Sequence, residues 1–382
     1  MKQDKPITVT LPYLPPRSVF DKYIDEIWEN VYLTNQGPLH NRFEDKIAEF
    51  LEADNVTLTV NGHMALDIAL KGLSIQGEVI TTPFTFASTT HVLTLNRITP
   101  IWGDIRESDL TLDPDLIESL ITEKTTAIMP VHVYGHLCDI KRIGAIAQKY
   151  NLKVIYDAAH AFGESYDGRS VAHCGDVSAF SFHATKLFNS IEGGALTYAD
   201  TNLKRIFDAY KNFGIEDEEQ IDFVGCNAKM NEFQAAMGLA VLPDVPVLIR
   251  KRREITLRYR EMLSGIEGVR YFAPEEEDPK LSYNYAYFPV LINENTFGVS
   301  RNAVYDYLKQ NSILTRKYFY PLISDYGCYK NPYQQWHFPV ASRISEEVLC
   351  LPIYHSLDLD DVDRIVSLLC KCGNNRKISS AY

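Results

Sequence analysis

Short apolar segments alternate with amphipathic helical segments along most of this chain, and this alternation restricts the fold more than any other feature. The apolar segments are rich in β-forming residues and are bounded by turn residues, which is typical of buried strands. Strands separated by helices of this length predict an α/β protein with a mainly parallel sheet and right-handed crossovers. The expected strands include residues 56–60, 98–102, 127–133, 154–156 and 177–182.

The chain is long enough for two domains. Its 382 residues are 46% hydrophobic with mixed charge, as in a globular protein with a large core. Asp244-Val-Pro246 interrupts the pattern, so we expect a large domain over residues 1–245 and a small C-terminal α+β domain over residues 246–382. In the second domain we expect strands within 282–291 and 315–320 and a helix over 247–263, whose basic residues 250–253 form a solvated face.

Charge and composition disfavour several classes of protein. A net charge of −12 and a pI near 5.4 argue against nucleic-acid partners, because phosphate backbones attract basic surfaces. No long uninterrupted apolar segment or signal peptide is evident, so we expect a cytoplasmic protein without a membrane span. Seven scattered cysteines fit reduced thiols. His132 and His136 flank a Tyr-Gly pair without the helical context of a metal site, so no metal is expected.

Two ionisable residues follow consecutive expected strands in the middle of the chain. Asp157 ends the strand 154–156, and Lys186 follows the strand 177–182, at the edge where open α/β sheets bind ligands. A desolvated lysine exposes the neutral amine that condenses with the aldehyde of pyridoxal phosphate (PLP). A carboxylate facing the pyridine nitrogen keeps it protonated, so that the ring accepts electrons. Taken singly, Asp157 reads as a helix cap and Lys186 as a solvated charge.

Three motifs in this region carry a resemblance to a known family. They are Asp157-Ala-Ala-His160, Ser181-Phe-His-Ala-Thr-Lys186 and Glu192-Gly-Gly194. They resemble the DegT/StrS family of PLP-dependent nucleotide-sugar aminotransferases, and the resemblance extends from Leu33 to Tyr354. It implies the fold type I aminotransferase architecture, with a mostly parallel seven-stranded sheet between helices in the large domain. Lys186, Asp157 and His160 are the catalytic residues that it implies.

The same resemblance implies a set of cofactor contacts. The turn at Gly62 and His63 would bind the phosphate at a helix N-terminus, although the family usually has threonine where this chain has His63. Phe86 would stack on the PLP ring, and without the resemblance it reads as a core residue. His160 and Ser181 would also contact the cofactor, and a core histidine is the alternative for His160. Asn227 would reach the phosphate from a neighbouring subunit, which implies a homodimer.

Further residues are implied for the sugar nucleotide. Thr34 and Asn35 stand in a turn-rich loop that helps to form the substrate cleft in the family, and an ordinary surface turn is an equal alternative. His183, Arg316 and Tyr318 are the remaining candidates for substrate contacts.

The expected reaction is amino transfer from L-glutamate to C4 of dTDP-4-keto-6-deoxyglucose, for O-antigen or surface-polysaccharide sugars. Lys186 would act as general base and acid. Three alternatives stay open: a C3 aminotransferase acting on a dTDP-3-keto-6-deoxysugar, a sugar dehydratase of the same fold, and a non-catalytic sensor. The presence of Lys186 disfavours the dehydratase, in which histidine replaces that lysine.

Overall fold

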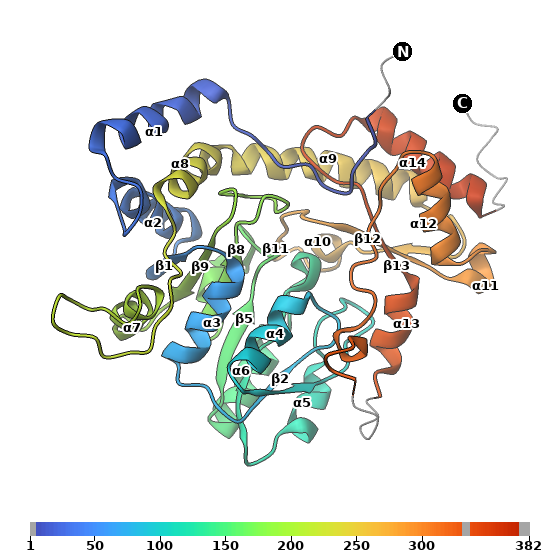
Figure 1. The fold of residues 1–382 in the computed structure, drawn as a ribbon. Coiled ribbons are helices and arrows are strands. Elements are labelled where there is room, and N and C mark those ends of the chain that lie inside the picture. Colours follow the sequence, from blue (N-terminus) through green and yellow to red (C-terminus); the bar gives the residue numbers. More distant parts are fainter. Residues whose placement is uncertain (1–4, 331–336, 374–382) are drawn as a thin grey trace.

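A sheet of seven strands forms the centre of the protein, whose computed structural model describes residues 5–330 and 337–373 (Figure 1). The strand order is β1-β9-β8-β5-β4-β2-β3. β9 runs antiparallel to both of its neighbours, and the other paired strands are parallel. The predicted α/β class with a mostly parallel sheet is therefore confirmed. The bounds are β1 (Asn55–Thr59), β2 (Glu78–Thr81), β3 (Thr99–Trp102), β4 (Thr125–Ile128), β5 (Lys153–Asp157), β8 (Val177–Ser181) and β9 (Gly194–Tyr198).

Helices cover both faces of this sheet, because alternate strand residues point to opposite sides. In β5, Ile155 packs in the cluster that contains residues of α3, α4 and α7, whereas Tyr156 packs in the cluster with α2, α6 and α8. The strands are thus apolar on both faces, as parallel strands between helix layers must be. The bounds are α1 (Arg17–Asn30), α2 (Pro38–Leu51), α3 (Gly62–Gly72), α4 (Ala87–Leu95), α5 (Pro114–Leu120), α6 (Ile140–Tyr150), α7 (Asn202–Lys211) and α8 (Glu232–Val241).

The connection from β5 to β8 differs from the other crossovers, because it contains no α-helix. It forms a short hairpin, β6 (Ser165–Tyr166) and β7 (Arg169–Ser170), on which β11 (Leu281–Ser282) adds a third strand. A distant part of the chain therefore packs beside the loop that follows Asp157.

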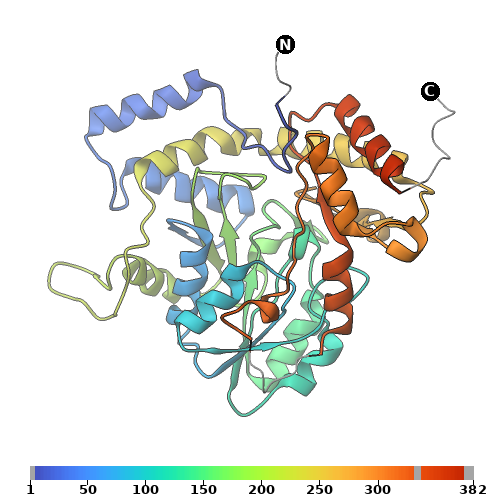
Figure 2. The ribbon, with the colours of Figure 1, turned by 45° about the vertical axis from the view of Figure 1, so that its right-hand side comes forward.

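A second sheet lies beside the first, with the order β10-β12-β13 (Figure 2). Its core includes residues of the helices around it, and Ile7 packs there from the other end of the chain. The division of domains at residue 245 stays a prediction. The bounds are α9 (Val245–Leu263), β10 (Val269–Tyr271), α10 (Pro274–Glu277), β12 (Phe288–Ile292), α11 (Glu294–Phe297), α12 (Arg301–Gln310), α13 (Pro339–Glu347), β13 (Val348–Leu351) and α14 (Leu359–Cys372).

Three expectations for this second part were wrong. Residues 315–320 form no strand, and Arg316 makes only an isolated bridge with Cys350. The strand expected over 282–291 is interrupted, because residues 283–287 lie between β11 and β12. Arg252 does not face solvent: its guanidinium is buried and donates to the carbonyl oxygens of Ala286 and Ile353.

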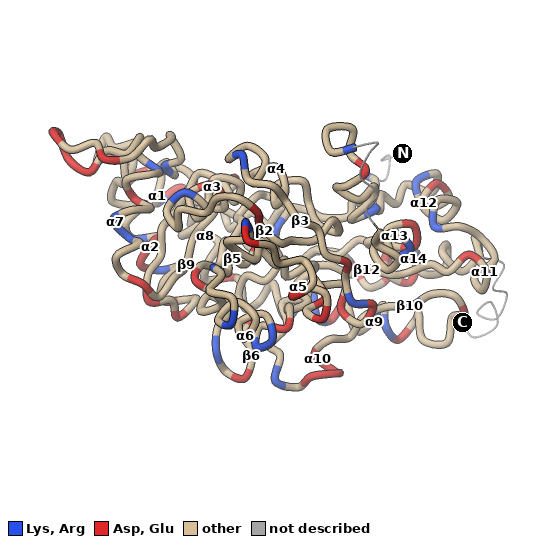
Figure 3. The backbone as a smooth tube through the Cα atoms, turned by 90° about the horizontal axis from the view of Figure 1, so that it is seen from below, with Lys and Arg blue, Asp and Glu red and all other residues tan. Residues whose placement is uncertain are grey.

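Charged residues of both signs are interspersed along the backbone (Figure 3). Within the described residues, one helical run, Glu232–Leu263, is long and apolar enough by composition to cross a membrane. Because 67% of its most apolar window is buried inside the protein, it has the character of a core helix.

Candidate active site

A cavity of about 420 Å³ opens where β5 and β8 end, next to the start of α3. Nine of the residues singled out in the sequence line it, and they come from segments far apart in the chain. They are Gly62, His63, Phe86, Asp157, His160, Ser181, His183, Lys186 and Tyr318. The two ionisable residues of the central motifs therefore face one space, as their positions on adjacent strands predict.

Asp157 is the last residue of β5 and is buried in the wall of the cavity. One carboxylate oxygen accepts a hydrogen bond from the hydroxyl of Thr89 at 2.7 Å, and the other accepts one from the N–H of Ala159 at 3.1 Å. Burial raises the pKa of Asp157, while these two hydrogen bonds and the nearby Lys186 oppose the rise. The carboxylate is thus held in a fixed orientation with little solvent around it.

Lys186 lies just beyond β8 and extends into the same cavity. Its Nζ donates a hydrogen bond to the hydroxyl of Tyr287 at 3.2 Å. Burial lowers the pKa of Lys186 to about 8, against the attraction of Asp157, which raises it. Roughly one tenth of this amine is neutral and nucleophilic at pH 7, and about half is neutral near pH 8, far more than for an exposed lysine.

The start of α3 supplies backbone N–H groups to the cavity. The side chain of Asn61 caps the helix by accepting the N–H of Met64 at 2.9 Å, and among the described residues no acceptor takes the N–H groups of Gly62 and His63. Gly62 is required here, because a Cβ atom would lie 2.8 Å from the Cβ of Ser181. The helix N-terminus therefore sits against the end of β8, where it can accept an anion.

His63 is accommodated by a hydrogen bond between its Nδ1 and the hydroxyl of Ser88, 2.7 Å apart. Partial burial lowers the pKa of His63. The neutral ring thus contributes no positive charge to the anion site, and the backbone groups carry the attraction.

His160 and Phe86 lie at the cavity in different ways. His160 is buried, and its Nδ1 accepts the N–H of Tyr134 at 2.9 Å, so burial and this bond favour the neutral ring. His160 is thus both a buried residue of the core and a residue that lines the cavity. Phe86 is 59% exposed at the start of α4, so it is not a core residue and its ring is free to contact a ligand.

Four predicted contact residues lie outside the lining of this cavity. Thr34 and Asn35 are exposed in the loop before α2, and Asn227 and Arg316 are also exposed. At the cavity itself, His183 lies 3.5 Å from the carboxylate of Glu192, measured from Nε2 to Oε1.

Sequence reasoning missed several residues that line the cavity or support its wall. Tyr287 and Phe319 come from the second part of the chain, and Thr89 reaches Asp157 from α4. Glu192 was recognised only as part of a motif. The one available signal was the tyrosine-rich run at residues 283–287, which was interpreted as a strand.

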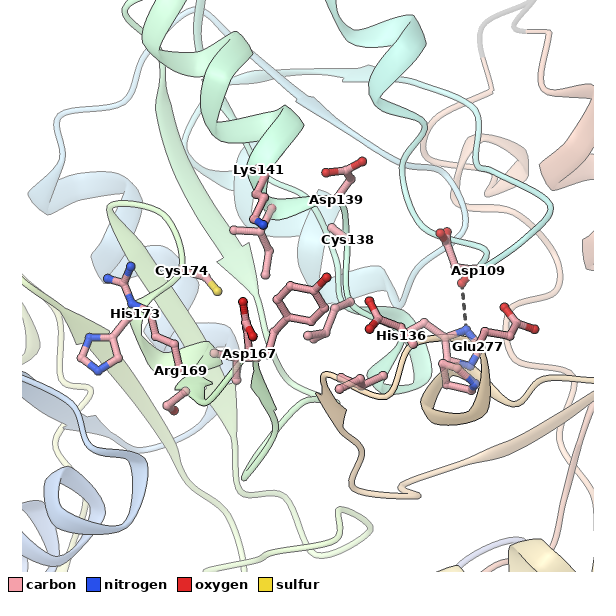
Figure 4. A pocket seen from close by; sticks show the side chains of 18 of the residues that line it. Asp109, His136, Cys138, Asp139, Lys141, Asp167, Arg169, His173, Cys174 and Glu277 are labelled. Atoms are coloured by element: carbon pink, nitrogen blue, oxygen red, sulfur yellow. Dashed lines mark hydrogen bonds between the residues drawn. The ribbon is translucent and has the colours of Figure 1, made fainter.

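A second cavity, of about 620 Å³, lies between the hairpin β6–β7, the start of α6 and α10 (Figure 4). Part of its charged lining is paired internally, around Arg106 and Asp109. Arg106 contacts Asp109 at 2.5 Å and Asp139 at 3.6 Å, and the Nδ1 of His136 lies 2.8 Å from the carbonyl oxygen of Asp109. None of the residues of the central motifs lines this cavity, so the cavity at β5 and β8 is the candidate active site.

Comparison with known proteins identifies the family. The profile of the DegT/DnrJ/EryC1/StrS aminotransferase family matches residues 17–370. The chain belongs to this family. It is therefore an aminotransferase, and enzymes of this family use PLP.

Two relatives carry the same name, dTDP-4-amino-4,6-dideoxy-D-glucose transaminase. The one from Shigella dysenteriae is 45% identical over 96% of this chain and 99% of its own length, and the one from Escherichia coli is 42% identical over 96% and 98%. Among solved structures, DesI in the presence of its TDP-sugar product is similar with a TM-score of 0.93 and 34% identity, covering 98% of this chain and 94% of DesI. The fold type I aminotransferase architecture is thereby confirmed.

The residues of the cavity fit PLP. The desolvated Lys186 suits the aldehyde, the oriented Asp157 suits the ring nitrogen, and the N–H groups at Gly62 suit the phosphate. Gly62 also leaves room where any larger residue would press on Ser181.

The lowered pKa of Lys186 predicts how the cofactor-free protein captures PLP. The capture rate is expected to rise with pH and level off above a midpoint near pH 8, because only the neutral amine reacts. Stopped-flow absorbance of PLP mixed with the cofactor-free protein measures this rate. A midpoint near 10.5, the ordinary pKa of lysine, would contradict the desolvated environment.

Proposed function

We propose that this aminotransferase moves an amino group from L-glutamate to C4 of dTDP-4-keto-6-deoxyglucose, for the synthesis of O-antigen or surface-polysaccharide sugars. One observation carries the proposal: a desolvated Lys186 and an oriented Asp157 face one cavity from adjacent strands. The names of the two relatives described above support the choice of sugar and carbon. A relative named dTDP-3-amino-3,6-dideoxy-alpha-D-galactopyranose transaminase is only 30% identical, which makes C3 the second candidate.

Lys186 and Asp157 perform the proton chemistry in this proposal. When bound, PLP withdraws electrons from the carbon being deprotonated and carries the amino group between the two substrates. The neutral Nζ of Lys186 takes a proton from the α-carbon of the donor. In the second half of the reaction, the protonated Nζ gives a proton to the sugar carbon that receives the amino group. Asp157 holds a proton on the ring nitrogen, and its bonds to Thr89 and Ala159 keep it aimed there.

Other residues bind and orient. The N–H groups of Gly62 and His63 hold the phosphate, and Ser181 contributes from the end of β8. Phe86 and His160 flank the ring. On the substrate side, the proposal assigns contacts to His183 and Tyr318 in the cavity and to Thr34, Asn35 and Arg316 at its approaches. The protein's net charge of −12 makes such local cations and donors necessary for an anionic sugar nucleotide.

We infer that the enzyme is a homodimer in which Asn227 reaches the cofactor phosphate of the other subunit. Asn227 lies in the loop after α7, which projects from the body of the protein (Figure 1). This loop exposes large apolar side chains, with Val224 at 93% and Ile221 at 63%. Such exposure favours a protein partner for the loop.

The dimer inference predicts the effect of a charge at Val224. Val224→Asp is expected to shift the protein from dimer to monomer and to weaken PLP binding by at least about tenfold, because a buried unpaired charge is costly. Light scattering after size-exclusion chromatography and PLP titration measure the two effects. Leu359→Asp is the matched control, since Leu359 is 47% exposed in the first turn of α14. A monomeric wild-type protein would contradict the inference.

The reaction is tested by incubation with L-glutamate and a panel of dTDP-, UDP- and GDP-linked 4-ketosugars and dTDP-linked 3-ketosugars. The expected product is the C4 amine of the dTDP-6-deoxysugar, identified by mass spectrometry and NMR. Amination of the 3-ketosugar alone would transfer the assignment to C3. The absence of any aminated product would favour the dehydratase or the sensor, neither of which the retained Lys186 and the family match support.

We infer a cytoplasmic location, where sugar nucleotides and glutamate are both present.

A further inference from the structure

We propose that Tyr287 is a positioning residue for Lys186, whose amine it holds in the cavity whenever that amine is not joined to the cofactor. The inference rests on the proposed function, because it concerns Lys186 as the proton carrier. The observation behind it is the hydrogen bond from the Nζ of Lys186 to the hydroxyl of Tyr287, 3.2 Å long. The Nζ atom lies 5.8 Å from the centre of the tyrosine ring, so the hydroxyl is its nearest part of Tyr287.

The tyrosine hydroxyl suits this task because it stays neutral. Burial raises the pKa of Tyr287, so the phenol is protonated at any working pH. A carboxylate in the same place would stabilise the ammonium form and remove the neutral amine that catalysis needs. The neutral hydroxyl orients the amine and raises the pKa of the lysine much less than a carboxylate would.

Tyr287 is itself fixed in place by its chain neighbours. The side-chain amide of Asn284 donates to the carbonyl oxygen of His160 at 2.8 Å, and its oxygen accepts the N–H of Ala286 at 2.9 Å. Arg252 then donates to the carbonyl oxygen of Ala286 at 3.0 Å. The segment before Tyr287 is thereby tied to the loop that follows Asp157, so the hydroxyl has a defined position relative to both catalytic groups.

Lysine needs such a contact more than most bases. Its ammonium or amine ends a flexible four-carbon chain, so a lysine released from the cofactor can adopt many rotamers. Misplacement of a catalytic group by about 1 Å can cost about 100-fold in rate. A fixed partner at the cavity wall therefore keeps the released amine within reach of the carbon atoms it must serve.

The test is Tyr287→Phe, which removes only the hydroxyl. Phenylalanine retains the ring that packs 4.5 Å from the ring of His160, so the variant is expected to fold and to bind PLP. Exchange of the α-hydrogen of glutamate with solvent deuterium, followed by NMR in the PLP-loaded enzyme, isolates the proton transfer. We expect exchange to be slower by about tenfold, as for loss of positioning without loss of the base.

Tyr283→Phe is the matched control on the same segment. Its hydroxyl donates to the carbonyl oxygen of Tyr134 at 3.1 Å and does not line the catalytic cavity. This variant loses a buried hydroxyl as well, so a merely structural effect would be shared by both variants. We expect its exchange rate to match that of the wild type.

A second measurement uses the cofactor-free protein. The hydroxyl accepts a hydrogen bond from Lys186 and so favours the charged amine, which means that its removal lowers the pKa of the lysine. The pH midpoint of PLP capture is expected to move to lower pH in Tyr287→Phe and to stay unchanged in Tyr283→Phe. Wild-type exchange and midpoint in Tyr287→Phe would overturn the inference and leave the proposed function intact. Failure of the wild-type enzyme to exchange glutamate would instead contradict the proposed function.

Discussion

Replacing Lys186 by alanine is expected to lower turnover by about 10⁴-fold, the upper end of what one general acid and base contributes. The same change removes the only amine that lines the cavity among the described residues. The visible absorbance that PLP acquires when joined to a protein lysine should therefore disappear. Steady-state amination of the ketosugar and an absorbance spectrum of the purified protein with added PLP measure the two effects.

Lys153→Ala provides the control, because Lys153 begins the strand that Asp157 ends. Its Nζ pairs with Asp176 at 2.8 Å on the surface, at the opposite end of β5 from the cavity. Activity and spectrum should match those of the wild type. An unchanged visible spectrum in Lys186→Ala would show that another lysine holds the cofactor.

The parts of this protein that were predictable from sequence depend on local patterns. Buried parallel strands give continuous apolar runs, and the residues that end them stand at one edge of the sheet. Asp157 and Lys186 met these conditions, since β5 and β8 are neighbours in the sheet. The turn at Gly62 was equally local, because a strand, a glycine and a helix start follow one another there.

Contacts between distant segments were not predictable in this way. Residues 283–287 have the composition of a strand, yet side chains and not a neighbouring strand make the hydrogen bonds that hold this segment in place. Asn284 binds the carbonyl oxygen of His160, and Arg252 binds that of Ala286. No periodic signal distinguishes such a segment from a strand. Tyr287 was therefore not recognised as a residue of the site, and Arg252 was predicted to lie on a solvated face of its helix.

The exposed residues predicted to contact the substrate or the other subunit stay untested for another reason. Thr34, Asn35 and Arg316 concern a substrate, and Asn227 concerns a second subunit, so contacts within one chain do not test them. Their roles stay predictions that rest on the family resemblance. The Val224→Asp experiment tests the dimer on which the role of Asn227 depends.

Asp157→Asn is expected to separate activity from stability. Asparagine has the same shape, but it carries no charge to hold a proton on the ring nitrogen, so turnover should fall by about 10³-fold. The amide can still accept the N–H of Ala159, and its NH₂ group can donate to Thr89, whose hydroxyl can then donate to Thr85. PLP should remain joined to Lys186, so the visible absorbance is retained while steady-state turnover is lost.

The stability of the cofactor-free protein gives an independent check. Burial raises the pKa of Asp157 above 3.8, so the folded state favours the protonated carboxyl. Its contribution to the free energy of unfolding is fully present below pH 3.8 and is lost as pH rises through the raised pKa. Asp157→Asn has no such loss, so urea unfolding from pH 4 to pH 8 should show a smaller fall in stability than in the wild type. A variant less stable than the wild type at pH 8 would show that the hydrogen bonds of the carboxylate outweigh the effect of its burial.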